Sequence, residues 1–322
     1  MICLGIECTA HTFGAAILKN KEILSNVKDM YQTKSGGIIP IEASKHHEKL
    51  GPNISDKAIK QASINENQID LISFSQGPGL PPTLKAGRDL AVNLAKKLNI
   101  PIIGVNHLLA HLEIGKLLTK AKNPVFILAT GANTQIISLE GNKYRILGEC
   151  LSIGLGNALD KFGRSIGLGF PCGPKIEALA KLGKYVELPY VVKAMDVEFS
   201  GIITKATQLH KKGISKEDLC FSLQETLFSM LTEVTERALS FTNKNEALLI
   251  GGVAANKRLT KMLSIMCNER SANFSVVPLD YAGDQAAMIA YLGILQHKHK
   301  TKDYNIDFDP NWRLDSIEID YR

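Results

Sequence analysis

A strand pattern occurs twice along the chain and restricts the folds that the chain can adopt. The first copy predicts short strands at 2–7, 14–18 and 23–27, and the second predicts strands at 125–129, 135–139 and 144–148. In each copy a short polar turn joins the last two strands, at 19–21 and at 140–143. Such turns between apolar segments are typical of antiparallel hairpins. We therefore expect two three-stranded meanders.

Helices and strands alternate after each meander. After the first we expect helices at 42–61, 80–98 and 106–118 and strands at 69–75 and 102–105. After the second we expect helices at 154–166, 175–182 and 215–241, strands at 247–250 and 274–277, and a helix opening near Asp284. This pattern predicts a duplicated α/β unit, with an N-terminal lobe at 1–120, a C-terminal lobe at 121–322, and a cleft between them that suits a nucleotide. Chance similarity of two meanders is the alternative.

Composition excludes several classes of protein. Of the 322 residues 45% are hydrophobic and 22% are charged, so wholesale disorder is excluded. No run reaches the roughly 18 apolar residues of a membrane helix, and the chain opens on a strand pattern rather than a signal peptide. The six cysteines are scattered without a Cys-x-x-Cys pair, so reduced thiols are expected. We expect a cytoplasmic globular protein without membrane contact.

The charge balance leaves the partner open. Lys and Arg number 38 against 32 Asp and Glu, a net charge of +6. Basic residues concentrate at 85–97, 116–122, 205–216 and 297–302. Such runs are either solvated faces or, where several share one side, a surface that follows RNA phosphates. Aromatic residues make up only 6%, which argues against a protein that binds single strands mainly by base stacking.

Two histidines and one aspartate are candidate metal ligands. His107 and His111 lie four apart in a segment of helical periodicity, so both imidazoles project from one helix face. The sequence is not His-Glu-x-x-His, and two ordinary helix histidines are the alternative. Asp284 precedes an apolar helix, where an N-cap is the expected role and a third metal ligand the alternative.

Three Gly-rich turns are candidate phosphate loops, at 130–133, 167–174 and 251–256. Glycine lets backbone amides approach a phosphate closely, and helix N-termini favour anions. None matches a Walker A loop or a complete Rossmann fingerprint. Asp160 and Glu177 flank the middle turn and could accept hydrogen bonds from ribose hydroxyls. The alternative for this pair is two solvated helix carboxylates.

The motifs together resemble a known family. They are Gly5–Glu7 with Thr9–Thr12, Gly36 and Gly37 with Pro40, Glu42 and Ala43 with His46 and His47, Ser75–Leu80, Val105–His107 with Ala110–Glu113, Asn133–Gln135, Gly154–Asp160, Gly167–Glu177, Met195–Gly201, Gln224–Thr226, Gly251–Asn256 and Ala286–Ala290. In this order they are similar to the archaeal and eukaryotic catalytic subunit of the KEOPS complex, the tRNA threonylcarbamoyladenosine synthase. That family is related to a universal bacterial family once called glycoproteases.

The resemblance implies a fold and a site. The fold is the duplicated one of the actin, Hsp70 and sugar-kinase (ASKHA) superfamily, with two mixed-sheet lobes around a central cleft. His107, His111 and Asp284 would hold one divalent metal ion per subunit, iron or zinc. The expected ligands of ATP, AMP or threonylcarbamoyl-AMP are Leu128, Ala129, Thr130, Gly131, Ala132, Asp160, Gly173, Glu177 and Asn256.

The chain departs from the family pattern near these residues. Leu128 stands where relatives often carry a metal-binding Tyr. Ala132 and Cys172 each replace a usual Gly, Ser152 a usual Asp and Gln285 a usual Asn. A shifted metal affinity or a weakly active scaffold subunit is therefore one alternative.

The resemblance also implies an activity. The chain would transfer threonylcarbamoyl from threonylcarbamoyl-AMP to the exocyclic amine of the adenosine next to the anticodon, in tRNAs that read codons beginning with A. Its expected partners are tRNA and the KEOPS subunits: a separate small kinase or ATPase, a small dimerising subunit and a regulatory subunit. The general base stays open among Glu7, His47 and the substrate phosphate. An ATP-dependent small-molecule kinase of the same fold is the main alternative, and a metalloprotease is disfavoured because His-Glu-x-x-His is missing.

Overall fold

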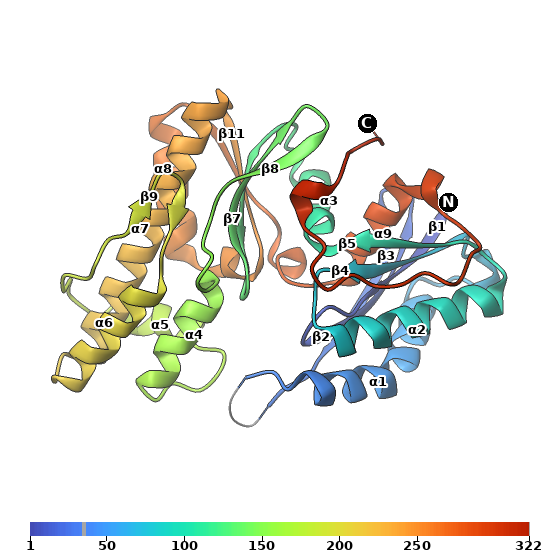
Figure 1. Cartoon of the computed structure of the whole chain (residues 1–322), viewed down its shortest axis with the longest axis horizontal. Coiled ribbons are helices and arrows are strands. Elements are labelled where there is room, and N and C mark those ends of the chain that lie inside the picture. The colour runs from blue at the N-terminus through green and yellow to red at the C-terminus, as the bar shows by residue number, and fades with distance from the viewer. Residues whose placement is uncertain (34–36, 322) are drawn as a thin grey trace. The chain divides into compact units, whose positions relative to one another are not determined.

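The chain forms two compact units. The computed structural model describes residues 1–33 and 37–321, so Gly36 of the family motif lies outside the described residues. Unit 1 contains Met1–Leu117 together with the chain from Asp284 onward, and unit 2 contains Leu118–Gly283 (Figure 1).

Unit 1 is built on a five-stranded mixed sheet in the order β3-β2-β1-β4-β5. Its strands are β1 (Ile2–Glu7), β2 (Thr12–Lys19), β3 (Glu22–Met30), β4 (Leu71–Gly77) and β5 (Ile102–Asn106). The first three are antiparallel, and β4 and β5 add in parallel. Its helices are α1 (Pro40–Gln61), α2 (Pro81–Leu98), α3 (His107–Thr119) and α9 (Ala286–Leu295). The helices α1 and α2 and the sheet enclose a core that includes Phe13 and Phe74.

Unit 2 repeats this topology in the order β12-β11-β6-β7-β8. Its strands are β6 (Val125–Ala129), β7 (Thr134–Glu140), β8 (Lys143–Glu149), β11 (Glu246–Ile250) and β12 (Asn273–Val276). Again three antiparallel strands are followed by two parallel ones. The predicted duplication is therefore confirmed, since strand order and direction both repeat.

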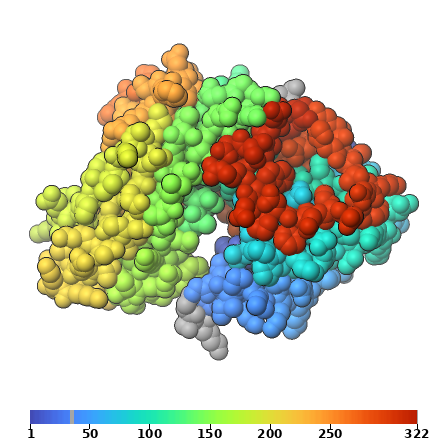
Figure 2. All heavy atoms as spheres, viewed as in Figure 1, coloured from blue at the N-terminus to red at the C-terminus, as the bar shows by residue number. Residues whose placement is uncertain are grey.

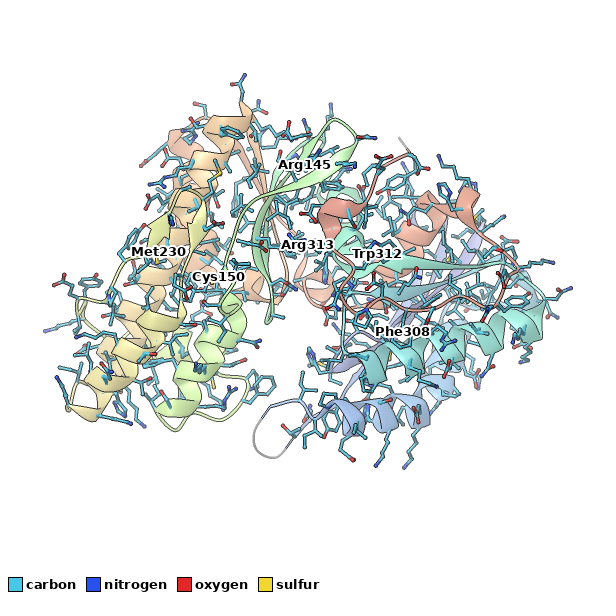
Figure 3. The ribbon with its side chains drawn as sticks, viewed as in Figure 1. Arg145, Cys150, Met230, Phe308, Trp312 and Arg313 are labelled. Carbon is cyan, nitrogen blue, oxygen red and sulfur yellow. The ribbon has the colours of Figure 1, made fainter. Side chains whose placement is uncertain are left out.

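The helices of unit 2 include two that the sequence pattern did not predict. They are α4 (Leu155–Ser165), α5 (Gly173–Ala180), α6 (Ser200–Lys211), α7 (Lys216–Thr242) and α8 (Lys257–Glu269). A small hairpin, β9 (Val192–Lys193) with β10 (Asp196–Val197), precedes α6. The unpredicted helices are α6 and α8. The long helix α7 buries side chains along its length, Met230 among them (Figure 3).

The last helix belongs to unit 1, whereas the sequence division placed everything after 120 in one C-terminal lobe. All side chains of α9 from Ala286 to Gly293 are buried, so the helix must be covered on every side. Gly5 in β1 allows this contact, because a Cβ there would lie 2.4 Å from the Ala286 carbonyl oxygen. Packing onto β1 therefore sets the position of Asp284, which directly precedes the helix.

The C-terminal segment continues across unit 1. The Asp309 amide donates to the Gln76 carbonyl at 2.8 Å, and the Asn106 side chain donates to the Trp312 carbonyl at 3.0 Å. Figure 2 shows this red segment lying over the teal part of the unit. Phe308 and Trp312 both come from it (Figure 3), and the Arg88 guanidinium lies 5.9 Å from the Phe308 ring centroid. The C-terminal segment thus contacts Asn106, the residue directly before α3 and His107.

Among the described residues, no helix combines the length and the apolar character that crossing a membrane requires. The six cysteines are free and buried. The cytoplasmic location stays a prediction.

Candidate metal centre and nucleotide-binding loops

The two histidines and Asp284 converge in unit 1. Helix α3 begins at His107. The side-chain oxygen Oδ1 of Asn106 caps this helix by accepting a hydrogen bond from the Leu109 amide at 2.9 Å. Asp284 Oδ1 lies 3.3 Å from His111 Nε2 and 3.5 Å from His107 Nε2. One potential ligand atom from each of the three residues lies within 4.8 Å of the other two. Folding therefore brings the three sequence candidates together.

The donor set and its spacing fit a metal ion. Two imidazole nitrogens and a carboxylate oxygen are ligands that zinc and iron accept. Bonds of about 2.0–2.2 Å in a tetrahedron separate neighbouring ligand atoms by roughly 3.3–3.6 Å. Both separations from Asp284 Oδ1, 3.3 Å and 3.5 Å, fall in that interval. The two separations that involve Asp284 are thus those of a tetrahedral site, and the three ligand atoms as a set lie within 4.8 Å of one another.

Glu7 orients His107. Its carboxylate is fully buried, and Oε2 accepts from His107 Nδ1 at 3.0 Å. The other oxygen accepts from the Thr9 amide at 2.9 Å and the Thr9 hydroxyl at 2.5 Å. Because Nδ1 carries the donated hydrogen, Nε2 is the nitrogen that faces Asp284. A carboxylate behind a metal-ligating histidine is a common supporting contact in metal sites.

The electrostatics of the cluster favour a positive charge. Burial alone would lower the pKa of His107, but the Glu7 and Asp284 carboxylates raise it to about 10. Burial lowers the pKa of His111, and its hydrogen bond with the Asp284 carboxylate offsets only part of that effect. Burial opposes ionisation of Asp284, yet hydrogen bonds from both histidines hold its pKa well below the usual value. Two carboxylates around two imidazoles thus stabilise a cation at this point.

Asp284 does not cap α9, contrary to the expected role. The cap is Gln285, whose side-chain oxygen accepts from the Met288 amide at 3.1 Å. The cap is therefore one residue later, which leaves the Asp284 carboxylate directed at the histidines. Gln285 is fully buried, and its Nε2 has no hydrogen-bond partner among the described residues.

The two side chains considered as general bases are both engaged within the protein. The Glu7 oxygens bind Thr9 and His107. His47 is 1% exposed, its Nε2 donates to the Ala10 carbonyl at 2.9 Å, and its Nδ1 lies 3.2 Å from His46 Nδ1. Both residues therefore organise the loop after β1 in this structure.

The first and third Gly-rich turns meet in unit 2. The turn after β6 is closed by the Thr130 amide, which donates to the Asn133 carbonyl at 2.9 Å. The first turn of α4 binds it, since the Gly156 amide donates to the Thr130 carbonyl at 3.0 Å. Gly251 has φ of +96°, and a Cβ there would lie 2.3 Å from the Ala129 carbonyl oxygen. Glycine is thus required for this approach.

The expected nucleotide residues of this turn differ in accessibility. Gly131 and Ala132 are exposed, and Thr130 is partly exposed. Leu128 and Ala129 lie inside β6 with fully buried side chains. Leu128 therefore offers a ligand neither a side-chain donor nor an accessible surface.

The expected ribose-binding residues cap helices. Asp160 Oδ1 accepts from the Cys172 amide at 2.8 Å, just before α5 begins at Gly173. On α5, Glu177 Oε1 accepts from the Lys257 amide at 2.9 Å. Each carboxylate thus binds a backbone amide at the start of a helix, and both residues are partly exposed.

Asn256 completes this arrangement. Its Oδ1 accepts from the Arg258 and Leu259 amides at 3.0 and 3.2 Å and so caps α8. Its Nδ2 donates at 2.8 Å to Gln224 Oε1 on α7. Gln224 is absent from the expected site, although the motif Gln224–Thr226 contains it; its contact with Asn256, 32 residues along the chain, is what assigns it to the site. Glu177 and Asn256 are thereby brought to one helix N-terminus.

The chain matches a known family and several known proteins. The family model TsaD, tRNA N6-adenosine threonylcarbamoyltransferase, matches residues 22–291. Proteins of that name from Archaeoglobus fulgidus and Thermococcus sibiricus are 48% and 50% identical, over 100% and 99% of both chains. A probable bifunctional tRNA threonylcarbamoyladenosine biosynthesis protein from Methanocaldococcus jannaschii is 48% identical over 100% of this chain and 60% of its own length.

Solved structures support the fold. HypF from T. kodakarensis matches with a TM-score of 0.64 at 15% identity, over 92% of this chain and 48% of its own. The activator of 2-hydroxyisocaproyl-CoA dehydratase from Clostridium difficile matches with a TM-score of 0.56 at 13% identity, over 92% and 96%. These two likenesses concern the fold alone. By the family model and the full-length relatives, the chain belongs to the TsaD family of tRNA N6-adenosine threonylcarbamoyltransferases.

Proposed function

We propose that this chain transfers a threonylcarbamoyl group to the N6 amine of an adenosine in tRNA, with one divalent metal ion held by His107, His111 and Asp284. The observation that carries the proposal is the convergence of three ligand atoms within 4.8 Å in a member of this family. The kinase alternative explains neither this cluster nor the buried Glu7 behind it.

The donor is threonylcarbamoyl-AMP. The adenosine N6 attacks the carbamoyl carbon, the bond from that carbon to the phosphate oxygen breaks, AMP leaves, and N6 loses a proton. The turn Thr130–Ala132, whose residues are exposed or partly exposed, and the acceptors Asp160 and Glu177 suit a nucleotide. Asn256 holds the start of α8 beside Glu177. Gly173 is the first residue of α5 and lies at the same end of that helix as the Asp160 carboxylate, which accepts from the Cys172 amide.

A bound metal ion would supply Lewis-acid polarisation of the carbamoyl carbonyl or stabilise charge on the phosphate. The chain's own residues do the positioning: Glu7 fixes the His107 ring, and Asn106 caps the helix that carries both histidines. Because Glu7 and His47 are engaged, the departing phosphate is the favoured acceptor of the N6 proton. Much of the rate would then come from holding the amine against the electrophile.

The finer assignments are parts of the same proposal. The target is the adenosine next to the anticodon in tRNAs that read codons beginning with A. The chain acts as the catalytic subunit of KEOPS, with a separate kinase or ATPase, a dimerising subunit and a regulatory subunit. A relative whose name describes a bifunctional protein, and whose chain is longer than this one, supports the action of this chain together with a separate partner subunit. The metal is iron or zinc, as the nitrogen and oxygen donors allow.

The test is a complete reaction. The protein is incubated with threonine, bicarbonate, ATP, the adenylate-forming enzyme, the partner subunits and tRNA, and modified adenosine is measured by mass spectrometry. We expect modification, and we expect His107→Ala to abolish it and to lose bound metal measured by elemental analysis. His297→Ala, an exposed histidine outside the site, is the matched control. Unmodified tRNA in the complete assay, or phosphorylation of a small molecule instead, would contradict the proposal.

A further inference from the structure

The positive charge of the chain is concentrated in one segment of unit 2. Residues 161–216 contain ten Lys and Arg against four Asp and Glu, an excess equal to the +6 of the whole chain. All ten basic side chains are exposed, and none of them forms an ion pair within the described parts of the chain. Unpaired exposed cations at this density lower the free energy of a bound polyanion.

Part of this charge surrounds one loop. The loop 167–171 joins α4 to α5, and α4 ends with Arg164 in its last turn. Lys175 Nζ donates to the Gly169 carbonyl at 2.6 Å. Lys216, the first residue of α7, places its Nζ 3.9 Å from the Cβ position of Gly167. Three helices thus bring three cations to the loop.

Neighbouring helices extend the surface. The Ser165 and Thr207 hydroxyls lie 3.1 Å apart, so α6 lies against the end of α4. Lys205, Lys211 and Lys212 on or just after α6 are exposed. The helices α4, α5 and α6 lie together in Figure 1.

The loop also presents an aromatic ring. Phe170 is 58% exposed, although a phenyl ring is usually buried. The next residues lead into α5, whose start is capped by Asp160 of the candidate nucleotide site. An exposed ring among cations, beside a nucleotide-type site, matches RNA, because an RNA backbone supplies phosphates to the cations and an unpaired base supplies a face that stacks on the ring.

We propose that Arg164, Lys175 and Lys216, together with Phe170, form a tRNA-binding surface. This surface contains none of the three predicted metal ligands. The cations contact backbone phosphates, and Phe170 packs against an unpaired base. The inference rests on the proposed function, since it takes tRNA as the substrate. We call these four residues the loop cluster.

The test compares two triple variants of the full chain with its partner subunits. R164Q/K175Q/K216Q removes the cations of the loop cluster. K21Q/K57Q/K60Q removes three exposed unpaired lysines from unit 1 as a matched control. Affinity for unmodified tRNA is measured between about 50 and 200 mM salt, an interval across which affinity that depends on phosphate contacts falls steeply.

We expect the loop-cluster variant to bind tRNA about tenfold more weakly and to reduce the slope of log affinity against log salt by about one for each cation. The control variant should keep the wild-type slope, and AMP affinity should stay unchanged in both. Phe170→Ala should weaken tRNA binding equally at each salt concentration with the slope unchanged. Thermal melting monitors folding, and the single variants replace the triple one if it is unstable.

The outcomes separate the two proposals. If the wild-type assembly leaves tRNA unmodified, the proposed function fails before the loop cluster is tested. If the wild-type assembly modifies tRNA and the loop-cluster variant keeps its slope and KM, the inference is overturned. It is also overturned if AMP affinity falls as much as tRNA affinity, which would assign the cations to the nucleotide phosphate. Loss of a partner subunit with unchanged tRNA binding would assign them to an acidic protein surface.

Discussion

The Glu7 carboxylate accepts a hydrogen bond from His107 Nδ1 at 3.0 Å and thereby turns Nε2 of the same ring toward Asp284, 3.5 Å away. Glu7 ends β1, and His107 begins α3, 100 residues later. The first strand of the sheet therefore orients a predicted metal ligand without contributing a ligand itself. A carboxylate in this position also raises the basicity of the imidazole.

Glu7→Gln should lower metal affinity about tenfold to a hundredfold, because the uncharged amide holds the ring less firmly and supports less positive charge. Competition with a chelator of known affinity measures the change. Glu42→Gln is the control, since Glu42 is exposed and its carboxylate pairs with Lys45 on the same helix. Equal affinities of the Glu7→Gln and wild-type proteins would show that Glu7 does not support the site.

Gly251→Ala should destabilise unit 2 by about 1–3 kcal/mol, because its φ of +96° is strained for alanine and its Cβ would meet the Ala129 carbonyl at 2.3 Å. Chemical denaturation measures the loss. Gly252→Ala is the matched control, since a Cβ at that neighbouring glycine meets nothing within 4 Å. Similar stabilities of the two variants would contradict the close approach of the two loops.

Gln285→Ala should destabilise the protein by about 1 kcal/mol, the usual loss when a helix cap is removed. The Met288 amide would lose its acceptor while Asp284 stays in place. Gln285→Asn retains a capping side chain and should cost less. Stability and metal content are measured together: a variant that loses metal while stability is unchanged would show that Gln285 acts on the site and not on the helix.

The hydrogen bond between Gln224 and Asn256 should couple the two residues. Asn256→Ala removes the cap of α8 and should cost about 1 kcal/mol, and Gln224→Ala leaves the Asn256 amide without its partner. A double-mutant cycle on stability and AMP affinity should give a coupling of about 0.5–3 kcal/mol. Gln208→Ala, exposed on α6, is the control. Strict additivity would mean that Gln224 does not position Asn256.

Local patterns were sufficient for the repeated elements. The predicted strands 2–7 and 125–129 coincide with β1 and β6, and the polar turns of both meanders lie where expected. These features depend on alternation and turn residues, which neighbouring positions encode. Helix α8 differs: its buried face carries Leu259, Leu263, Met266 and Cys267 at helical spacing, but polar residues lie between them. Its cap, Asn256, also ends a Gly-rich stretch that by itself is typical of a loop, so the local pattern does not predict this helix.

Local sequence patterns therefore encode the duplicated α/β plan, the helical spacing of His107 and His111, and the motifs that the chain shares with its family. Tertiary packing is what brings Asp284 to His111 across 173 residues, makes Gln285 the cap, and joins Gln224 to Asn256. This division arises because periodicity and capping act between near neighbours. Contacts between distant residues depend on how helices such as α9 pack onto a sheet, and a glycine such as Gly5 allows that approach.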